Sequence, residues 1–280
     1  MSDLPLLSVE NLSVTFRTPK GLVEAVRGVS FELGHERLGI VGESGSGKSQ
    51  TGRAILRLTA GNGEISARRL KFRDQDILKA NAKALRDLRG RKISMIMQDP
   101  RYSLNPVMTV GDQIAEAYLV HSQSNAKEAR QRALKMLATV RIREPEKVYN
   151  LYPHEVSGGM GQRIMIAMML IPEPDVMIAD EPTSALDVTV QLQVLALLDD
   201  MVRERGMGLI LISHDLNLVA SFCDRILVMY GGKIMECLQS NRLQDARHPY
   251  TRGLLNCLPK IDGSHSVLPV LKRDPLWLEG

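Results

Sequence analysis

The chain has 280 residues, of which 44% are hydrophobic and 24% are charged. This composition is ordinary for a globular protein, and the length suffices for one large domain or for a domain with an embedded lobe. The 36 basic and 32 acidic residues leave a net charge of +4. Because this excess is small and scattered, it argues only weakly for nucleic acid or acidic lipid as a partner.

Hydropathy and cysteine spacing exclude further classes of protein. No apolar run is long enough to span a bilayer, and the N-terminus lacks the basic flank and long apolar stretch of a secretion signal. We therefore expect a cytoplasmic protein that is not itself embedded in a membrane. Cys223, Cys237 and Cys257 form no Cys-x-x-Cys pair, so we expect structural thiols and neither a disulfide framework nor a zinc or iron–sulfur site.

The first 35 residues alternate between apolar and polar side chains, as β-strands do. Leu12, Val14 and Phe16 share one parity, and the alternation resumes over residues 25–31 after a turn at 18–21. The chain is therefore expected to begin with β-strands.

A glycine-rich loop follows an apolar strand at 38–41 and precedes a predicted helix at 51–58. From Gly42 to Ser49 it reads Gly-Glu-Ser-Gly-Ser-Gly-Lys-Ser. Glycines let the backbone curl so that several N–H groups point into one concavity, which suits a polyanion. Lys48 can then bridge the β- and γ-phosphates of a nucleotide, and the Ser49 hydroxyl can ligate Mg²⁺. The strand, loop and helix together favour a phosphate site over a solvated glycine turn.

A second apolar run, at 93–97, ends at Gln98, and the pattern changes after it. Residues 99–156 are predicted to be helical. Asn125 and Glu128 are spaced as a capping box, and the apolar residues that follow recur at helical spacing. We expect this stretch to form a helical lobe.

Strand-like runs return at 176–179 and 209–212, on either side of an apolar helix at 188–202. Runs without alternation that are separated by helices suit a parallel sheet buried on both faces. The first run ends in Asp180 and Glu181. Beside the phosphate loop, Asp180 could hold Mg²⁺ and Glu181 could polarise the attacking water. A helix N-cap would explain the aspartate equally well when it is taken alone.

A second anion site is predicted where Ser157, Gly158 and Gly159 open an apolar helix at 164–170. The start of a helix presents free N–H groups and the positive end of the helix dipole. An N-capped helix after a flexible loop is the plainer interpretation. Two phosphate-binding helix termini on one chain, separated by a helical lobe, suggest that each nucleotide is shared between two copies.

The C-terminal part carries weaker signals. Residues 225–238, with Gly231 and Gly232 in their middle, predict a hairpin at the edge of the sheet. The prolines at 249, 259, 269 and 275 predict an irregular appendix. Its role cannot be read from the sequence.

Ordered motifs together resemble an ABC transporter ATPase subunit, over residues 7 to about 258. They are the glycine loop, Gln98, the run 157–162, Asp180-Glu181, the run 184–187 and His214. Within this family the chain resembles the group that imports peptides and nickel. The marks of that group are the segment 98–106, the Ser-Gly-Gly-Met start of the signature run at 157–160, and Arg-His-Pro-Tyr-Thr at 247–251.

The resemblance implies an α/β fold with a P-loop NTPase (RecA-like) core. The core is expected at 1–98 and 157–240 and includes an N-terminal antiparallel β subdomain. An α-helical subdomain is expected to be inserted at 99–156, and the appendix covers 241–280.

The resemblance also assigns roles to single residues. Glu181 resembles the catalytic base, Lys48 neutralises charge on the phosphates, and His214 resembles the switch histidine that contacts the γ-phosphate. Without the family, a capping role beside Ser213 and Asp215 would be the plainer interpretation of His214. The Mg²⁺ ligands that the resemblance implies are Ser49, Gln98 and Asp180. The nucleotide contacts that it implies are Phe16, Gly42, Glu43, Ser44, Gly45, Ser46, Gly47, Lys48, Ser49, Gln50, Gln98, Ser157, Gly158, Gly159, Gln162 and Asp187. Phe16 would stack on adenine, and core packing is its alternative.

The implied function is that of an ATP-hydrolysing, Mg²⁺-dependent subunit of an importer for peptides or a related small solute such as nickel, a metal chelate or an opine. The implied partners are a second and paralogous ATPase subunit, two membrane permeases and an extracytoplasmic solute-binding protein, with no nucleic acid. The expected place is the cytoplasmic face of the bacterial inner membrane. The solute itself cannot be read from this chain.

Two alternatives come from other classes. A soluble ABC ATPase acting on DNA or ribosomes would need long coiled coils or tandem cassettes. The segment between Gln98 and Ser157 is too short for the first, and the single glycine loop argues against the second. A generic P-loop kinase would have no use for the signature run.

Overall fold

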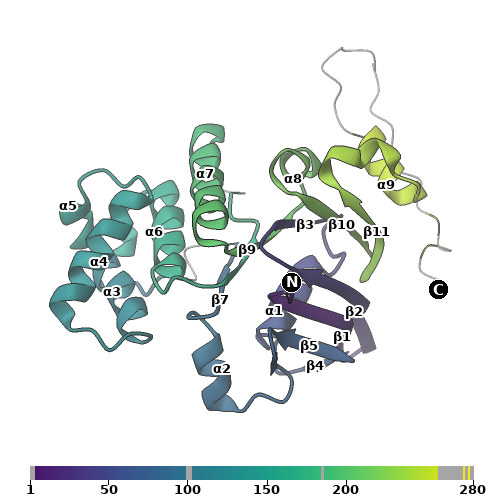
Figure 1. The fold of residues 1–280 in the computed structure, drawn as a ribbon, viewed down its shortest axis with the longest axis horizontal. Helices are drawn as coiled ribbons and strands as arrows, with labels where there is room; N and C mark the ends of the chain where they lie inside the picture. The colour runs from purple at the N-terminus through teal and green to yellow at the C-terminus, as the bar shows by residue number, and fades with distance from the viewer. Residues whose placement is uncertain (1–3, 99–102, 184–185, 258–273, 275–276, 278–280) are drawn as a thin grey trace. The chain divides into compact units, whose positions relative to one another are not determined.

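The computed structural model describes residues 4–98, 103–183, 186–257, 274 and 277 (Figure 1). The chain divides into two compact units. The first unit contains Met1–Lys79 and Ile210–Gly280, and the second contains Ala80–Leu209. The chain thus leaves the first unit once and returns to it within a β-strand.

The first unit contains most of the strands. In chain order its elements are β1 (Leu7–Thr18), β2 (Gly21–Leu33), β3 (Arg37–Val41), α1 (Lys48–Ile55), β4 (Gly63–Ser66), β5 (Arg69–Phe72), β6 (Gln75–Asp76), β9 (Gly208–Ser213, which begins in the second unit), α8 (Leu216–Phe222), β10 (Arg225–Tyr230), β11 (Lys233–Gln239), the 3₁₀-helix η3 (Ser240–Asp245) and α9 (Pro249–Asn256).

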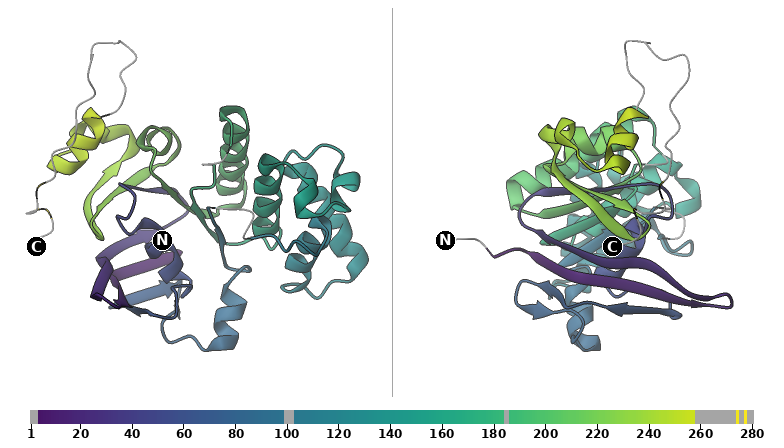
Figure 2. Two further views of the ribbon diagram at one scale, coloured as in Figure 1. Left: turned by 180° about the vertical axis from the view of Figure 1, so that it is seen from behind. Right: turned by 90° about the vertical axis from the view of Figure 1, so that its right-hand side faces the viewer.

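The chain begins with β-strands, as the alternation predicts, and they form an antiparallel sheet, as the resemblance implies. It has the order β2-β1-β5-β6, and β4 also pairs with β1. The long β1–β2 hairpin stands out in the right-hand view of Figure 2. Its turn joins Thr18 to Gly21, whose φ of 117° suits glycine. Leu12 and Val14 are fully buried, whereas Phe16 on the same parity is half-buried.

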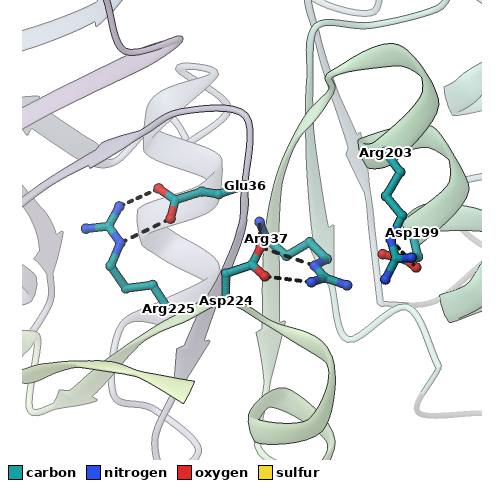
Figure 3. A network of polar contacts seen from close by, with 6 residues as sticks. All are labelled: Glu36, Arg37, Asp199, Arg203, Asp224 and Arg225. Atoms are coloured by element: carbon teal, nitrogen blue, oxygen red, sulfur yellow. Dashed lines mark hydrogen bonds and ion pairs between the residues drawn. The ribbon is translucent and has the colours of Figure 1, made fainter. Parts of the chain in front are cut away.

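The second sheet of the first unit has the order β11-β10-β3-β9. β3 runs parallel to β10, and β10 and β11 form the predicted edge hairpin. Two crossed ion pairs fasten the start of β3 to the start of β10 (Figure 3). Arg37 Nη2 lies 2.6 Å from Asp224 Oδ1, and Arg225 Nη2 lies 2.6 Å from Glu36 Oε1. The strand that leads into the glycine loop is therefore anchored at its beginning.

The second unit is mainly helical. Its elements are α2 (Ala82–Leu88), β7 (Ile93–Ile96), α3 (Val110–Leu119), α4 (Ala126–Thr139), α5 (Pro145–Tyr149), η2 (Pro153–Glu155), α6 (Gly158–Leu170), β8 (Val176–Asp180) and α7 (Val188–Arg205). β7 and β8 are buried and pair in parallel, and α3 to α6 pack together (Figure 1). α7 carries a surface ion pair between Asp199 and Arg203, drawn in Figure 3.

The predicted start of the helix at 126 is confirmed, with one difference in its cap. The Asn125 side chain accepts the backbone N–H of Glu128 at 3.0 Å. The Glu128 carboxylate accepts the Tyr118 hydroxyl at 3.1 Å, a contact between helices that the local spacing does not reveal. No described helix combines the length and the apolar character that crossing a membrane requires.

The described part of the C-terminal segment differs from the irregular appendix that its prolines predict, because residues 240–245 form η3 and residues 249–256 form α9. The prolines at 259, 269 and 275 lie outside the described residues. α9 starts with Pro249, whose fixed φ suits the first helical position. His248 caps this helix by accepting the Tyr250 N–H on Nδ1 at 3.2 Å. Proline therefore starts a helix here.

Candidate functional site

The glycine loop joins the buried strand β3 to α1, which begins at Lys48 with Gly47 as its N-cap. Gly42 and Gly47 have φ values of 154° and 97°. A β-carbon at Gly42 would collide with the Met229 carbonyl, and one at Gly47 with the Ala25 carbonyl. The loop can therefore lie this close to its neighbours only with glycine at these two positions.

Lys48 is folded back into the loop and is only 6% exposed. Its ammonium group donates to the carbonyl oxygens of Gly42 at 2.8 Å and Glu43 at 2.9 Å. The carbonyl of Ser46 accepts the Gly232 N–H at 3.1 Å, so the hairpin turn between β10 and β11 also holds the loop. The predicted phosphate-binding lysine thus lies at the N-terminus of α1, where the helix dipole adds positive potential.

The residues of the loop fit a bound triphosphate. Ser44 and Gly45 are exposed at its rim, and a β-carbon built on Gly45 would meet no other atom within 4 Å. The Gln50 side-chain oxygen is buried and has no hydrogen-bond partner within the described residues. Exposed backbone, a buried ammonium group and an unsatisfied amide oxygen are what an anionic ligand with a hydrated cation would engage.

His214 lines a cavity of about 470 Å³ in the first unit together with Gly42 and Glu43. The histidine is exposed directly after β9. The capping role belongs to Asp215, whose Oδ1 accepts the N–H groups of Asn217 at 2.9 Å and Leu218 at 3.1 Å. His214 is therefore placed on a cavity wall beside the glycine loop, and its contact with a γ-phosphate stays a prediction.

The predicted carboxylate pair lies at the end of β8 in the second unit. Asp180 is the last residue of the strand and is 1% exposed, so the alternative of a helix N-cap is wrong. Glu181 follows with φ of 49°, a left-handed conformation that non-glycine residues rarely adopt and that gathers at functional sites. Gln98 Nε2 donates to Glu181 Oε2 at 3.1 Å. The structure thus joins two predicted site residues from the ends of neighbouring strands.

The signature run opens α6 as predicted. The Ser157 hydroxyl caps the helix by accepting the Met160 N–H at 3.4 Å, and Ser157 and Gly158 are exposed. Behind them, Arg163 donates to the carbonyls of Gly159 and Arg141. Burial lowers the pKa of Arg163, and the charge of Asp187 opposes that shift.

Gln162 is placed differently from the other members of the run. It is 1% exposed, and its Nε2 donates to the Pro182 carbonyl at 2.6 Å. Since Pro182 follows Glu181, this bond ties the signature helix to the turn that carries the proposed base. Spacing alone does not reveal such a link, and the predicted nucleotide contact of Gln162 stays a prediction.

The remaining predicted residues are described in part. Asp187 is exposed and caps α7 by accepting the Val190 N–H at 3.0 Å. The Phe16 ring lies against Gly63 and remains partly exposed, so core packing does not bury it, and adenine stacking stays a prediction. Residues 99–102 of the segment after Gln98, and residues 184–185 of the run before Asp187, lie outside the described residues.

Comparisons with known proteins agree with this architecture. A family model described as ABC transporter matches residues 26–184. The dipeptide transport ATP-binding protein DppD of Bacillus subtilis is 48% identical over 273 residues, which cover 96% of this chain and 82% of that protein. The oligopeptide transport ATP-binding protein OppD of Escherichia coli is 46% identical over 272 residues, which cover 96% and 80%. A dimeric ATP-binding cassette in a post-hydrolysis state, bound to ADP and Pi, superposes with a TM-score of 0.74 at 26% identity, covering 84% of this chain and 98% of the other.

Proposed function

Because the chain belongs to the ABC transporter family of ATPases, we propose that it is the ATP-hydrolysing subunit of an importer for peptides or a related small solute. The observation that carries the proposal is the glycine loop with Lys48 folded into it, on a chain that is nearly half identical to transport ATP-binding proteins over almost its full length. The related small solutes are nickel, a metal chelate and an opine, and the relatives' names favour peptides.

Each group then has a defined task in hydrolysis. Lys48 and the loop N–H groups bind the phosphates, and His214 contacts the γ-phosphate. Glu181 takes the proton of the attacking water, and the Gln98 amide orients its carboxylate. Ser49, Gln98 and Asp180 would hold Mg²⁺, which neutralises charge on the phosphates when bound. The protein therefore contributes mostly by positioning the attacking water and by neutralising charge on the phosphates.

The signature run is proposed to act on a nucleotide held by a second ATPase subunit. Ser157, Gly158 and Asp187 are exposed, so their N–H groups and carboxylate are accessible from outside this chain. A related cassette was solved as a dimer. We propose that the partner is a paralogue rather than a second copy.

The membrane partners are proposed to be two permeases, with a solute-binding protein on the far side and this chain on the cytoplasmic face of the bacterial inner membrane. The helical subdomain at 99–156 would receive a permease helix. A cavity of about 380 Å³ in the second unit is lined by Ser103, Asn105 and Met108. Val107 is 78% exposed, whereas Leu104 is 6% exposed, so Val107 suits a crosslinking probe better than Leu104.

The test is reconstitution of the chain with the second ATPase subunit, the permeases and the binding protein in proteoliposomes. We expect peptide-dependent hydrolysis, ATP-driven uptake, and crosslinks from a cysteine at position 107 to a permease. ATPase activity that responds to DNA or ribosomes and not to the permeases would support the soluble alternative instead.

A further inference from the structure

The Arg-His-Pro-Tyr-Thr run at 247–251 has no task in the mechanism above, yet it brings Tyr250 to the glycine loop. Tyr250 is fully buried on α9, and its hydroxyl accepts the backbone N–H of Glu43 at 3.1 Å. These residues are separated by 207 positions in the sequence. A buried tyrosine hydroxyl that takes a loop N–H is a specific polar contact, because an orphaned buried N–H is costly.

The contact falls on one particular peptide unit. The N–H of Glu43 and the carbonyl of Gly42 belong to the same planar amide. That carbonyl accepts the Lys48 ammonium at 2.8 Å, while the N–H is donated to Tyr250. The Gly42–Glu43 peptide therefore bridges the phosphate-binding lysine and the tyrosine, and rotation of this peptide would break both hydrogen bonds.

Tyr250 is itself packed against other aromatic rings. Its ring packs on Tyr230 with centroids 4.6 Å apart and on Trp277 at 5.8 Å. The turn before α9 is fastened to β11, because the Glu236 carboxylate accepts the N–H groups of Arg247 at 2.7 Å and His248 at 3.2 Å. Burial raises the pKa of Glu236, but the Arg247 and His248 N–H groups, the Thr251 hydroxyl and the charge of His248 together leave the pKa lowered, so the carboxylate is charged and accepting at neutral pH.

We propose that Tyr250 is a positioning residue of the phosphate loop, which makes the C-terminal segment a determinant of ATP affinity. The inference rests on the proposed function, because it assumes that ATP binds at Gly42–Ser49. Tyr250 sets the orientation of the Gly42–Glu43 peptide. Because the Gly42 carbonyl of this peptide accepts the Lys48 ammonium, Tyr250 also sets the position of that ammonium group. It touches no reacting atom, so it acts on binding and not on the chemical step.

The test compares Tyr250→Phe with Tyr230→Phe. Both changes remove one phenolic hydroxyl from the same aromatic group, and the Tyr230 hydroxyl makes no hydrogen bond within the described residues, so Tyr230→Phe is the matched control. For Tyr250→Phe we expect the dissociation constant of ATP and the KM of the assembled ATPase to rise roughly 5- to 10-fold, the loss of one hydrogen bond. We expect kcat to change less than about 2-fold, since the reacting groups are untouched.

A second readout is hydrogen exchange of the loop in the ATP-free chain. Exchange of the Glu43 amide should be faster in Tyr250→Phe than in Tyr230→Phe, while the amides of β1 keep their protection. Unchanged ATP affinity in a folded Tyr250→Phe would overturn the proposal. An equal loss of ATP affinity in Tyr250→Phe and Tyr230→Phe would also overturn it, because the loss would then come from packing of the aromatic group and not from the hydrogen bond to Glu43.

Lys48→Ala separates this inference from the proposed function. If ATP binds Lys48→Ala as tightly as the unaltered chain, the phosphate-loop assignment fails and the role of Tyr250 fails with it. If Lys48→Ala loses ATP while Tyr250→Phe binds normally, only the role of Tyr250 is wrong.

Discussion

The glycine loop of the first unit and the signature run of the second unit both present helix N-termini suited to anions, but they are held in different ways. In the loop, Lys48 and Ser46 are 6% and 3% exposed, and the backbone is held by Gly232 and Tyr250. In the signature run, Ser157 and Gly158 are exposed and the cap is a single long hydrogen bond of 3.4 Å. The loop is organised by contacts within its own chain, whereas the start of the signature helix is exposed, as the proposed contact with a second subunit requires.

Both regions differ from the carboxylate pair at the end of β8. There Glu181 is in a strained conformation and is held by Gln98. The neighbouring Asp180 is buried at the end of the strand. We therefore expect Glu181 to act on water and Asp180 only to bind a ligand. Three substitutions, each with a control, test whether these regions have the separate tasks that their environments suggest.

The largest effect is expected from Glu181→Gln. The amide keeps the size of the side chain but cannot accept a proton, so hydrolysis should fall by about 10²- to 10⁴-fold while ATP still binds. Glu173→Gln is the control, because Glu173 is another glutamate with positive φ, 57°, and it is exposed on the surface. Steady-state ATPase rates and ATP titrations of both variants decide the matter. Hydrolysis at the normal rate by Glu181→Gln would remove the base from the mechanism.

Lys48→Ala should lose ATP binding itself, whereas Glu181→Gln should lose only hydrolysis. Removing a charge-assisted contact to phosphate should weaken ATP affinity by roughly 10- to 100-fold, and hydrolysis should fall with it. Lys147→Ala, which removes an exposed surface ammonium group, is the control and should bind ATP normally. Calorimetric titration measures the affinities. If Lys48→Ala bound ATP as tightly as Lys147→Ala does, the glycine loop would not be the phosphate-binding site.

A change in the signature run should leave ATP binding intact and reduce hydrolysis only when a second subunit is present. Ser157→Arg places a bulky side chain at an exposed helix start, so the isolated chain should bind ATP within about 2-fold of normal. When this chain is paired with the paralogous ATPase subunit (the mixed pair), hydrolysis should fall at least about 10-fold, because the second anion site is blocked. Asn81→Arg is the control, since Asn81 caps α2 of the same unit by accepting the Ala84 N–H at 2.9 Å.

The mixed pair has its own test. We expect the isolated chain to be largely monomeric and slow, and addition of the partner subunit to raise hydrolysis well above the sum of the two. An ATP-dependent homodimer of this chain with full activity, and transport without a second ATPase, would refute the mixed pair.

The parts of the fold that the sequence predicts are those encoded locally. Alternation predicts β1 and β2, glycine predicts the loop and the β10–β11 turn, and a serine followed by glycines predicts the start of α6. The sequence does not predict the features that depend on distant contacts or on very short elements. The Tyr250 hydroxyl and the Glu43 N–H meet across 207 positions, and the Gln162 amide reaches Pro182 between two elements. The strands β4 to β6 are two to four residues long, too short to show a period.

The smallest effect concerns the packing behind the glycine loop, at Cys223. This thiol is 4% exposed, and its Sγ lies close to Gly39 of β3. Burial raises the pKa of Cys223 to about 12, so the reactive thiolate is scarce at pH 8. A chain with Cys237→Ser and Cys257→Ser keeps Cys223 alone and should resist a maleimide at pH 8 until denaturant is added, whereas the exposed Cys237 should react at once when it is the single thiol. Because the pKa is raised on folding, the contribution of this thiol to stability is complete below the unfolded pKa and declines as the pH rises toward 12. Rapid labelling of Cys223 in the native chain would mean that α8 separates from β3, and the loop would then not be held by a rigid support.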